Sequence, residues 1–407
     1  MKNSIGYFLY NERPMSGLIN SQVISLLKNL KKQKPDLLIT IVAFWQPWIY
    51  IAYFKELKNM RAILLKDGIK FRSYPFAIPE RHFFSNPFLL KLSENFVSLF
   101  LFIVLKFNKF SVLHSRGYFA ALCAVKMKRS FKDMKVIFDG RSLYPLECIT
   151  LGKFNFNDRI FNIWEENEKK ILEIATYSIG VSRPIVDYYQ KKCPGSSVRY
   201  IPCNVNTDVL HFCSESRDKI RRTMQWESQK VMVYIGSISV SFWNDIRIYR
   251  EYFKKMLVLD NDLFFLIITN SNQDILENEL KGYLPDRSYK IISSSHQEMR
   301  SWLSASDFGI QVMNEMPDSF SRLGVKLTEY FACGLPVVVN KHAGAAKGIV
   351  EVNDLGLVLE IDDSDFSCKF GDFINKLGVN DKEKFVNYAN SEFSLDTVTQ
   401  KYLQLYC

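Results

Sequence analysis

The sequence predicts an α/β protein built from two doubly wound parallel sheets in tandem, and three observations support this fold class. The chain has 407 residues, more than one ordinary core holds, which favours two domains of roughly 150 to 200 residues. Its composition, 47% hydrophobic and 24% charged, is that of a folded globular protein. Short β-rich runs alternate with longer amphipathic stretches almost from end to end, which is typical of parallel βαβ units.

Two series of predicted strands define the two domains. We expect a first domain over residues 1–205, a second over 206–385, and a C-terminal helix over 386–407 that packs back on the first domain. Ligands would then bind at the carboxyl ends of the strands, in a deep crevice between the domains. The strands are expected at 4–9, 37–43, 69–71, 111–113, 136–138, 177–180 and 198–201, then at 231–235, 263–269, 289–292, 308–311, 336–339 and 356–359, with helices such as 18–30 and 322–333 between them.

Charge is divided unequally between the two halves of the chain. Residues 1–200 hold 31 Lys and Arg against 15 Asp and Glu, a net of +16, whereas residues 201–407 hold 22 against 28, a net of −6. The first half is therefore expected to face something anionic, such as a membrane surface, nucleic acid or a phosphorylated substrate. The aromatic residues are spread along the chain without an RNA-binding signature, so nucleic acid is not expected as a partner.

The cysteines and the apolar runs predict the cellular compartment of the protein. Eight cysteines show no metal-ligand or CxxC spacing, and the N-terminal residues lack a signal-peptide pattern, so we expect a reduced, cytoplasmic protein. The most apolar run, residues 96–105, is about half the length of a membrane-spanning helix. We expect a buried helix there, with a helix lying in a membrane interface as the alternative.

One stretch in the second half, residues 319–340, has the residues for anion binding. It reads as a polar loop, a helix, a Gly-Leu-Pro stop and a buried Val-rich strand. The start of such a helix offers unpaired N–H groups to an anion, and Arg322 and Lys326 add full charges. Lys326 and Glu329 share one helical face, where Lys can reach a phosphate and Glu can accept hydrogen bonds from ribose hydroxyls. The alternative is an exposed ion pair on an ordinary crossover helix.

This stretch resembles the donor-binding signature of the family 4 retaining glycosyltransferases, which have two facing Rossmann-like domains, the GT-B fold. Lys326-Leu-Thr-Glu-Tyr-Phe-Ala-Cys-Gly-Leu-Pro-Val-Val is similar to the family variant KLxEYxAxGxPVV. By this resemblance Glu329 would bind the donor ribose and Lys326 the leaving diphosphate, while Ser321 stands where the family has another Glu. The implied donor-binding residues are Gly17, Gly236, Ser237, Ser295, His296, Ser321, Arg322, Leu323, Gly324, Val325, Lys326 and Glu329.

Two segments of the first half resemble family segments near the reaction centre. Residues 112–118 are similar to the strand end that carries a His in many members, which makes His114 and Arg116 catalytic candidates beside Lys326 and Glu329. A lone His at a strand end is more often a structural residue, so that alternative stays open.

The second segment and the first loop supply the acceptor candidates. Residues 137–147 are similar to the family's DxRGxxPEE loop, which implies that Asp139, Arg141 and Glu147 lie near the crevice; an Asp–Arg pair that fixes a turn is the alternative. The loop after the first strand resembles the family loop that approaches the donor phosphate and the acceptor. Ser16 is assigned to the acceptor side of this loop and Gly17 to the donor side.

The resemblance implies a retaining, hexosyltransferase-type enzyme that moves a sugar from a nucleotide-diphosphate sugar to an acceptor hydroxyl, without a metal or cofactor. We expect a lipid-linked or saccharide acceptor, in the synthesis of bacterial cell-surface polysaccharide, lipopolysaccharide or glycolipid. The basic first half would attach peripherally to anionic membrane at the cytoplasmic face. Asp260-Asn-Asp262 has the spelling of a metal-binding motif but is expected at a turn. A GT-B-like nucleotide-sugar epimerase and a catalytically silent nucleotide-sugar-binding subunit remain as alternatives.

Overall fold

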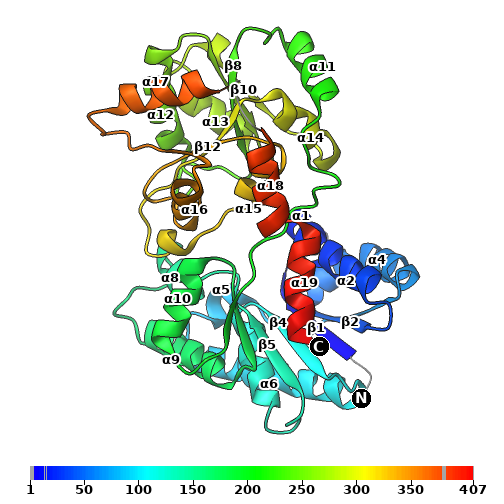
Figure 1. Ribbon diagram of the computed structural model, residues 1–407. Helices are drawn as coiled ribbons and strands as arrows, with labels where there is room; N and C mark the ends of the chain where they lie inside the picture. Colours follow the sequence, from blue (N-terminus) through cyan, green and yellow to red (C-terminus); the bar gives the residue numbers. More distant parts are fainter. Residues whose placement is uncertain (1–3, 13, 15, 378–381, 407) are drawn as a thin grey trace. The chain divides into compact units, whose positions relative to one another are not determined.

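The computed structural model describes residues 4–12, 14, 16–377 and 382–406, without the side chains of residues 81, 82 and 296. Two compact units make up the chain (Figure 1). The first unit comprises Met1–Pro202 together with Val398–Cys407, and the second comprises Cys203–Thr397.

The first unit contains a seven-stranded, wholly parallel sheet in the order β3-β2-β1-β4-β5-β6-β7. All seven strands coincide with the predicted runs within three residues at either end. They are β1 Ser4–Tyr10, β2 Leu38–Phe44, β3 Ile69–Tyr74, β4 Val112–Arg116, β5 Lys135–Asp139, β6 Tyr177–Gly180 and β7 Val198–Tyr200. The helices are α1 Gly17–Ile19, the π-helix η1 Asn20–Ile24, α2 Ser25–Gln33, α3 Pro47–Ala52, α4 Phe54–Lys66, α5 Glu80–Phe83, α6 Pro87–Phe107, α7 Tyr118–Met127, α8 Tyr144–Thr150, α9 Arg159–Ile174 and α10 Arg183–Lys192.

Both faces of this sheet are covered, which is why its central strands are continuous apolar runs. Alternate side chains of β1, such as Phe8 and Tyr10, pack with helices α6, α7 and α9 in one core cluster. On the opposite face, Tyr7 of β1 stacks against His114 of β4. The C-terminal helix α19 (Leu395–Tyr406) covers the part of this second face around His114, which Tyr406 contacts directly.

The second unit repeats the design with a six-stranded parallel sheet in the order β10-β9-β8-β11-β12-β13. Its strands again match the predicted runs: β8 Lys230–Ile235, β9 Leu263–Ile268, β10 Tyr289–Ile292, β11 Phe308–Gln311, β12 Val337–Val339 and β13 Gly356–Val358. The helices are α11 Ser214–Met224, α12 Ile246–Leu259, α13 Gln273–Leu280, α14 His296–Ala305, α15 Val325–Ala332, α16 Ala345–Asn353, α17 Phe366–Lys376 and α18 Lys382–Glu392, with 3-10 turns η2 Asp286–Ser288 and η3 Ser319–Ser321.

Two helices differ from the sequence prediction. The helix expected over 322–333 begins at Val325, because Arg322 is extended and the extended Gly324 forms the N-cap. The helix expected over 386–407 is two helices, because the chain breaks at Ser394, whose hydroxyl accepts a hydrogen bond from the Thr397 N–H. Helix α18 packs on α15 in the second unit, and α19 from Val398 onward belongs to the first.

Candidate functional site

A cluster of polar groups lies at the carboxyl edge of the second sheet. Strand β8 ends at Ile235, and Gly236 follows with φ +113°, a conformation that favours glycine. A Cβ atom on Gly236 would lie 3.6 Å from Cε and 3.7 Å from Nζ of Lys326, in the first turn of α15. Lys326 Nζ donates to the Tyr234 hydroxyl at 2.8 Å, and that hydroxyl donates to the Ser237 carbonyl at 2.6 Å. Gly236, Ser237 and Lys326, predicted from distant motifs, are therefore neighbours.

Burial shifts the pKa values of Lys326 and Glu329 toward their uncharged forms. Burial lowers the pKa of Lys326 from 10.5 to about 7, although Glu329 acts in the opposite direction. Burial also raises the pKa of Glu329 from 4.5 to about 7, against the effect of Lys326. Within the described residues the Glu329 carboxyl accepts no hydrogen bond, so the pair lacks the contacts that would fix both charges. A bound anion would restore the charge on Lys326.

Gln311, at the end of β11, adds an amide that the sequence analysis did not select. Its side chain is fully buried, and both its Nε2 and Oε1 atoms lack a hydrogen-bond partner among the described residues. A Cβ atom on Gly324, the N-cap of α15, would lie 3.0 Å from Gln311 Oε1, so glycine permits this close approach. Buried polar atoms are seldom left without a partner, and a water molecule or a ligand at the start of α15 would satisfy them.

Arg322 and Ser321 both make contacts within the loop before α15. Arg322 Nε donates to Asp318 Oδ2 at 2.6 Å, and its guanidinium stacks 3.5 Å over the Trp243 ring. Trp243 Nε1 donates to the other oxygen of the same carboxylate at 2.9 Å. The Ser321 hydroxyl donates to the Asp318 carbonyl at 2.8 Å. These contacts hold the loop before α15 in place, and the positive charge of Arg322 is offset by Asp318.

The remaining donor-side predictions lie around the same edge. Leu323 is buried and Val325 opens α15. Ser295 follows β10 and caps α14: its hydroxyl accepts from the Glu298 N–H, and Glu298 accepts from the Ser295 N–H. Helix α14 begins at His296, whose side chain lies outside the described part of the structure. Ser295 thus has a complete structural role without a ligand.

In the first unit a charged network lies where β4 and β5 end. Arg116 Nε donates to Glu12 Oε1 at 2.5 Å, and Arg116 Nη1 lies 3.7 Å from Asp139 Oδ2. Arg141, whose φ of +61° is rare for a non-glycine residue, has Nη1 3.7 Å from Asp139 Oδ1. Burial alone would raise the pKa of Asp139, but Arg141, His114 and Arg116 outweigh it and lower the pKa to about 2. Asp139 therefore stays ionised as the centre of the network.

His114 is enclosed by this network and by the C-terminal helix. Its side chain is fully buried, with Nε2 3.4 Å from Asp139 Oδ2 and Nδ1 2.9 Å from the Tyr406 hydroxyl. A neutral ring with its proton on Nε2 satisfies both contacts, and burial lowers the pKa of His114, which agrees with that state. Both nitrogens are thus occupied by protein groups, so the imidazole positions Asp139 and does not face solvent.

The other predicted site residues of the first unit are Ser16, Gly17 and Glu147, and each has its own local surroundings. Ser16 is the N-cap of α1, accepting from the Ile19 N–H at 3.2 Å, and Gly17 has open space where a Cβ atom would stand. Ser142 Oγ donates to Glu147 Oε2 at 2.5 Å in the first turn of α8. Ser16 therefore has a capping role in α1, and the assignment of Ser16 and Gly17 to substrates stays a prediction.

Sequence reasoning missed four side chains besides Gln311 that complete these clusters. Tyr234 was placed in its strand without a role, whereas Glu12, Tyr7 and Tyr406 were not singled out at all. Each acts through a contact with a residue 92 to 292 positions away, for example Tyr234 with Lys326 and Tyr406 with His114. No local pattern signals such contacts.

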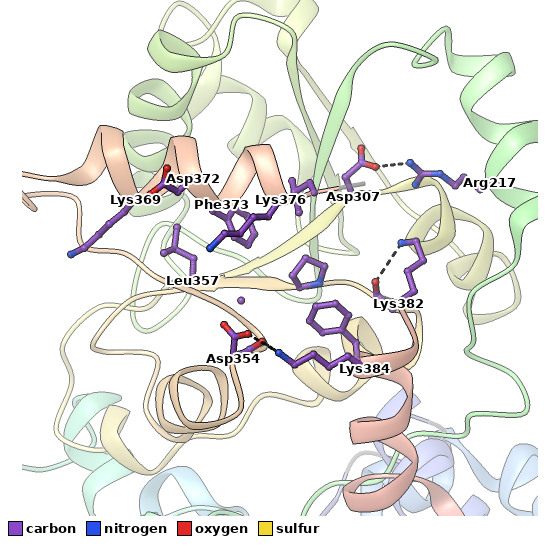
Figure 2. A pocket seen from close by; sticks show the side chains of 15 residues that line it. Arg217, Asp307, Asp354, Leu357, Lys369, Asp372, Phe373, Lys376, Lys382 and Lys384 are labelled. Atoms are coloured by element: carbon purple, nitrogen blue, oxygen red, sulfur yellow. Dashed lines mark hydrogen bonds and ion pairs between the residues drawn. The ribbon is translucent and has the colours of Figure 1, made fainter. Parts of the chain in front are cut away.

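A cavity of about 800 Å³ lies at the opposite edge of the second sheet (Figure 2). It is lined by Asp307, Pro336 and Gly356, which stand at the amino ends of β11, β12 and β13. Two ion pairs join charged groups of its lining, Arg217 with Asp307 at 2.6 Å and Lys384 with Asp354 at 2.7 Å (Figure 2). This cavity is therefore separate from the cluster around Lys326.

Asp260 and Asp262 lie at the turn between α12 and β9. Asp260 caps α12, accepts from the Asp262 N–H at 3.1 Å and pairs with Lys230 at 3.3 Å. Over the described residues there is no group of three or more His, Cys, Asp or Glu side chains placed to hold a metal ion.

Comparisons with known proteins agree with this architecture. Residues 229–375 match the family model described as glycosyl transferases group 1. The whole chain is similar in structure to sucrose-phosphate synthase from Thermosynechococcus elongatus (TM-score 0.69, 14% identity, covering 99% of this chain and 98% of that one). It is also similar to Anabaena HepE in complex with UDP (TM-score 0.66, 13% identity, 98% of both chains) and to WaaG, a glycosyltransferase involved in lipopolysaccharide biosynthesis (TM-score 0.64, 11% identity, 99% of both chains). A search of curated protein sequences finds no match.

Proposed function

Because the chain has the GT-B fold of glycosyltransferases and its second unit matches their group 1 family model, we propose that it is a retaining glycosyltransferase. It would move a sugar from a nucleotide-diphosphate sugar to an acceptor hydroxyl. The observation that carries this proposal is the contact of Lys326 with Gly236, at the carboxyl edge of the second sheet and the start of α15. Structural relatives bound to UDP and to UDP-glucose support a donor of this class.

Lys326 would stabilise the leaving diphosphate. As the bond to the sugar stretches, negative charge grows on the diphosphate, and a cation already in place lowers the barrier. The unpaired N–H groups at the start of α15 face the same charge. Lys326 is only partly protonated in the free protein at neutral pH, so its charge would develop most fully when the diphosphate is bound.

Glu329 would accept hydrogen bonds from the donor ribose. It lies one helical turn after Lys326, and no protein donor among the described residues occupies its carboxyl group. Ser321 cannot replace the family Glu in kind, because its hydroxyl is bonded to the Asp318 carbonyl. Recognition of the sugar hydroxyls would therefore fall to other groups, with the buried amide of Gln311 as a candidate.

The first unit would hold the acceptor at the ends of β4 and β5. Arg116 and Arg141 there surround Asp139, with Glu12 beside Arg116, and these groups can bind sugar hydroxyls or phosphate. We propose a lipid-linked or saccharide acceptor in bacterial cell-surface glycan synthesis, at the cytoplasmic face of the membrane. The similarity to a glycosyltransferase of lipopolysaccharide biosynthesis supports this choice.

The test starts with thermal shifts against nucleoside diphosphates and their sugars, since a ligand that binds the native state raises its apparent stability. The best donor is then incubated with sugar and lipid-linked acceptors, and the product is analysed by mass spectrometry and by NMR of the anomeric proton. A glycoside with the donor's anomeric configuration is expected. An inverted glycoside would refute retention, an epimerised sugar would establish the epimerase alternative, and binding without turnover would establish the silent subunit.

A further inference from the structure

Helix α6 exposes a continuous apolar face. Among the described residues it is the one helix with the length and composition of a membrane span, yet it is part of a folded domain. Successive exposed side chains on it are four, four, three, four and four residues apart, which places them on one side of a helix. They are Phe88 (74% exposed), Leu92 (52%), Phe96 (43%), Leu99 (57%), Ile103 (42%) and Phe107 (81%), and we call them the α6 face.

The opposite side of α6 anchors the helix in the first unit. Leu90, Val97, Leu101 and Val104 are at most 5% exposed and pack in the same core cluster as α7 and α9. Withdrawing α6 to cross a bilayer would expose this core. The expectation of a buried helix over residues 96–105 therefore holds for one side only, and the other side needs a partner that covers it without removing it.

The charges beside the α6 face are basic. Lys91 and Lys106 lie on the exposed part of the helix, and Lys109 follows directly after it. Lys126 of the neighbouring helix α7 adds a further cation, and the acidic Glu94 is buried beside Lys91 and Lys126. A second copy of this chain would bring like charges together, whereas an anionic lipid surface offers both an apolar layer and negative headgroups.

We propose that the α6 face is a membrane-docking surface. The helix would lie in the plane of the interface, with the six apolar side chains among the acyl chains and Lys91, Lys106 and Lys109 at the lipid phosphates. Because α6 leads from the third strand back to the fourth, Phe88 lies toward the carboxyl edge of the sheet and Phe107 toward the amino edge. Docking would thus lay the strands of the first sheet along the membrane, with the edge that carries Arg116 and Asp139 at the Phe88 end of the helix. This surface rests on the membrane location proposed above, and flotation tests it separately from sugar transfer.

The test is flotation of the full-length protein with vesicles of phosphatidylcholine, with or without phosphatidylglycerol. The wild type should float with the anionic vesicles, and less so at high salt. The variant Leu99→Glu/Ile103→Glu should lower the bound fraction about tenfold or more, because two charges would enter the apolar layer. The matched control Val258→Glu/Val352→Glu also replaces two aliphatic side chains by Glu, at positions of the second unit that are 77% and 81% exposed, and it should float like the wild type.

Two further measurements decide the interpretation. Circular dichroism melting and the thermal shift with UDP should be unchanged in both variants. A loss of flotation can then be attributed to the α6 face, because neither folding nor UDP binding has changed. A wild type that does not float, or a control that loses flotation equally, would overturn the proposal. So would light scattering that shows a wild-type dimer abolished by Leu99→Glu/Ile103→Glu, since the α6 face would then bind a second copy.

Discussion

The carboxyl edges of the two sheets treat buried charge in opposite ways. At the first, Asp139 is surrounded by Arg116, Arg141 and His114, and its pKa is lowered to about 2. At the second, the pKa of Lys326 and that of Glu329 both move to about 7, toward their uncharged forms. The first edge is thus a network that neutralises itself. At the second edge the attraction between Lys326 and Glu329 does not offset the burial of their charges, and a ligand can supply further contacts.

The largest expected difference between the two edges is in how much stability the protein loses when one buried charge is removed. Asp139→Asn leaves Arg116 and Arg141 without their shared carboxylate and should lower the free energy of unfolding by about 3 to 5 kcal/mol. Lys326→Met removes a charge that burial already disfavours, and should change it by less than about 1 kcal/mol. Urea unfolding followed by tryptophan fluorescence measures both values. Equal losses in the two variants would contradict the distinction.

At the second edge, removing a charge should affect activity strongly, although its effect on stability should be small. Lys326→Ala and Glu329→Ala should each lower kcat/KM by about 10²-fold or more, because both groups would contact the transition state. The matched controls are Lys347→Ala and Glu351→Ala, an exposed pair 3.9 Å apart on α16, which should stay within about twofold of the wild type. Wild-type turnover in the Lys326 and Glu329 variants would remove the site assignment.

The pH dependence of nucleoside diphosphate binding sharpens the comparison. Lys326 must be protonated to pair with the diphosphate, and its pKa in the free protein is about 7. Affinity should therefore weaken above pH 7, by up to about tenfold per pH unit, until the higher pKa of the bound state is passed. Isothermal titration calorimetry from pH 6 to 9, an interval of roughly three units around that pKa, gives the slope. Lys326→Met should bind weakly at every pH without this slope; an unchanged slope would assign it to another group.

The smallest effect is expected where α19 meets the first edge. Tyr406→Phe removes one hydrogen bond to His114 Nδ1 and should lower the free energy of unfolding by about 1 kcal/mol. Differential scanning calorimetry detects this as a drop in Tm. Nucleoside diphosphate affinity should not change, because Lys326 belongs to the other unit; a parallel loss of affinity would show that the edges are coupled.

The central strands were predictable because they are apolar runs between polar turns, as in the stretch of β9 from Leu263 to Ile268. The start of α15 was predicted three residues early, since nothing in the local pattern shows that Arg322 is held extended by its contact with Asp318. The break at Ser394 was missed for a similar reason. It is fixed by backbone bonds of Val205 with Phe393 and Leu395, nearly 190 positions away.

The residues of the candidate site likewise fall into those that local motifs predict and those that depend on distant contacts. Lys326, Glu329 and Gly236 could be selected from motifs, because the chemistry depends on residue type and local spacing. The enclosure of His114 could not, because it depends on Tyr406 and on the fold of α19 across the sheet. The orphaned amide of Gln311 likewise becomes visible only when its burial beside Gly324 is known.

The position of α19 has a consequence for how the protein is made. The last ten residues belong to the first unit, where Thr399 accepts a hydrogen bond from Asn29 and Tyr406 closes over His114. A ribosome delivers these residues only after the entire second unit has been synthesised. The unit that emerges first therefore completes its folding last, and a nascent chain that stops short of α19 carries a first sheet on which His114 lacks the cover of Tyr406.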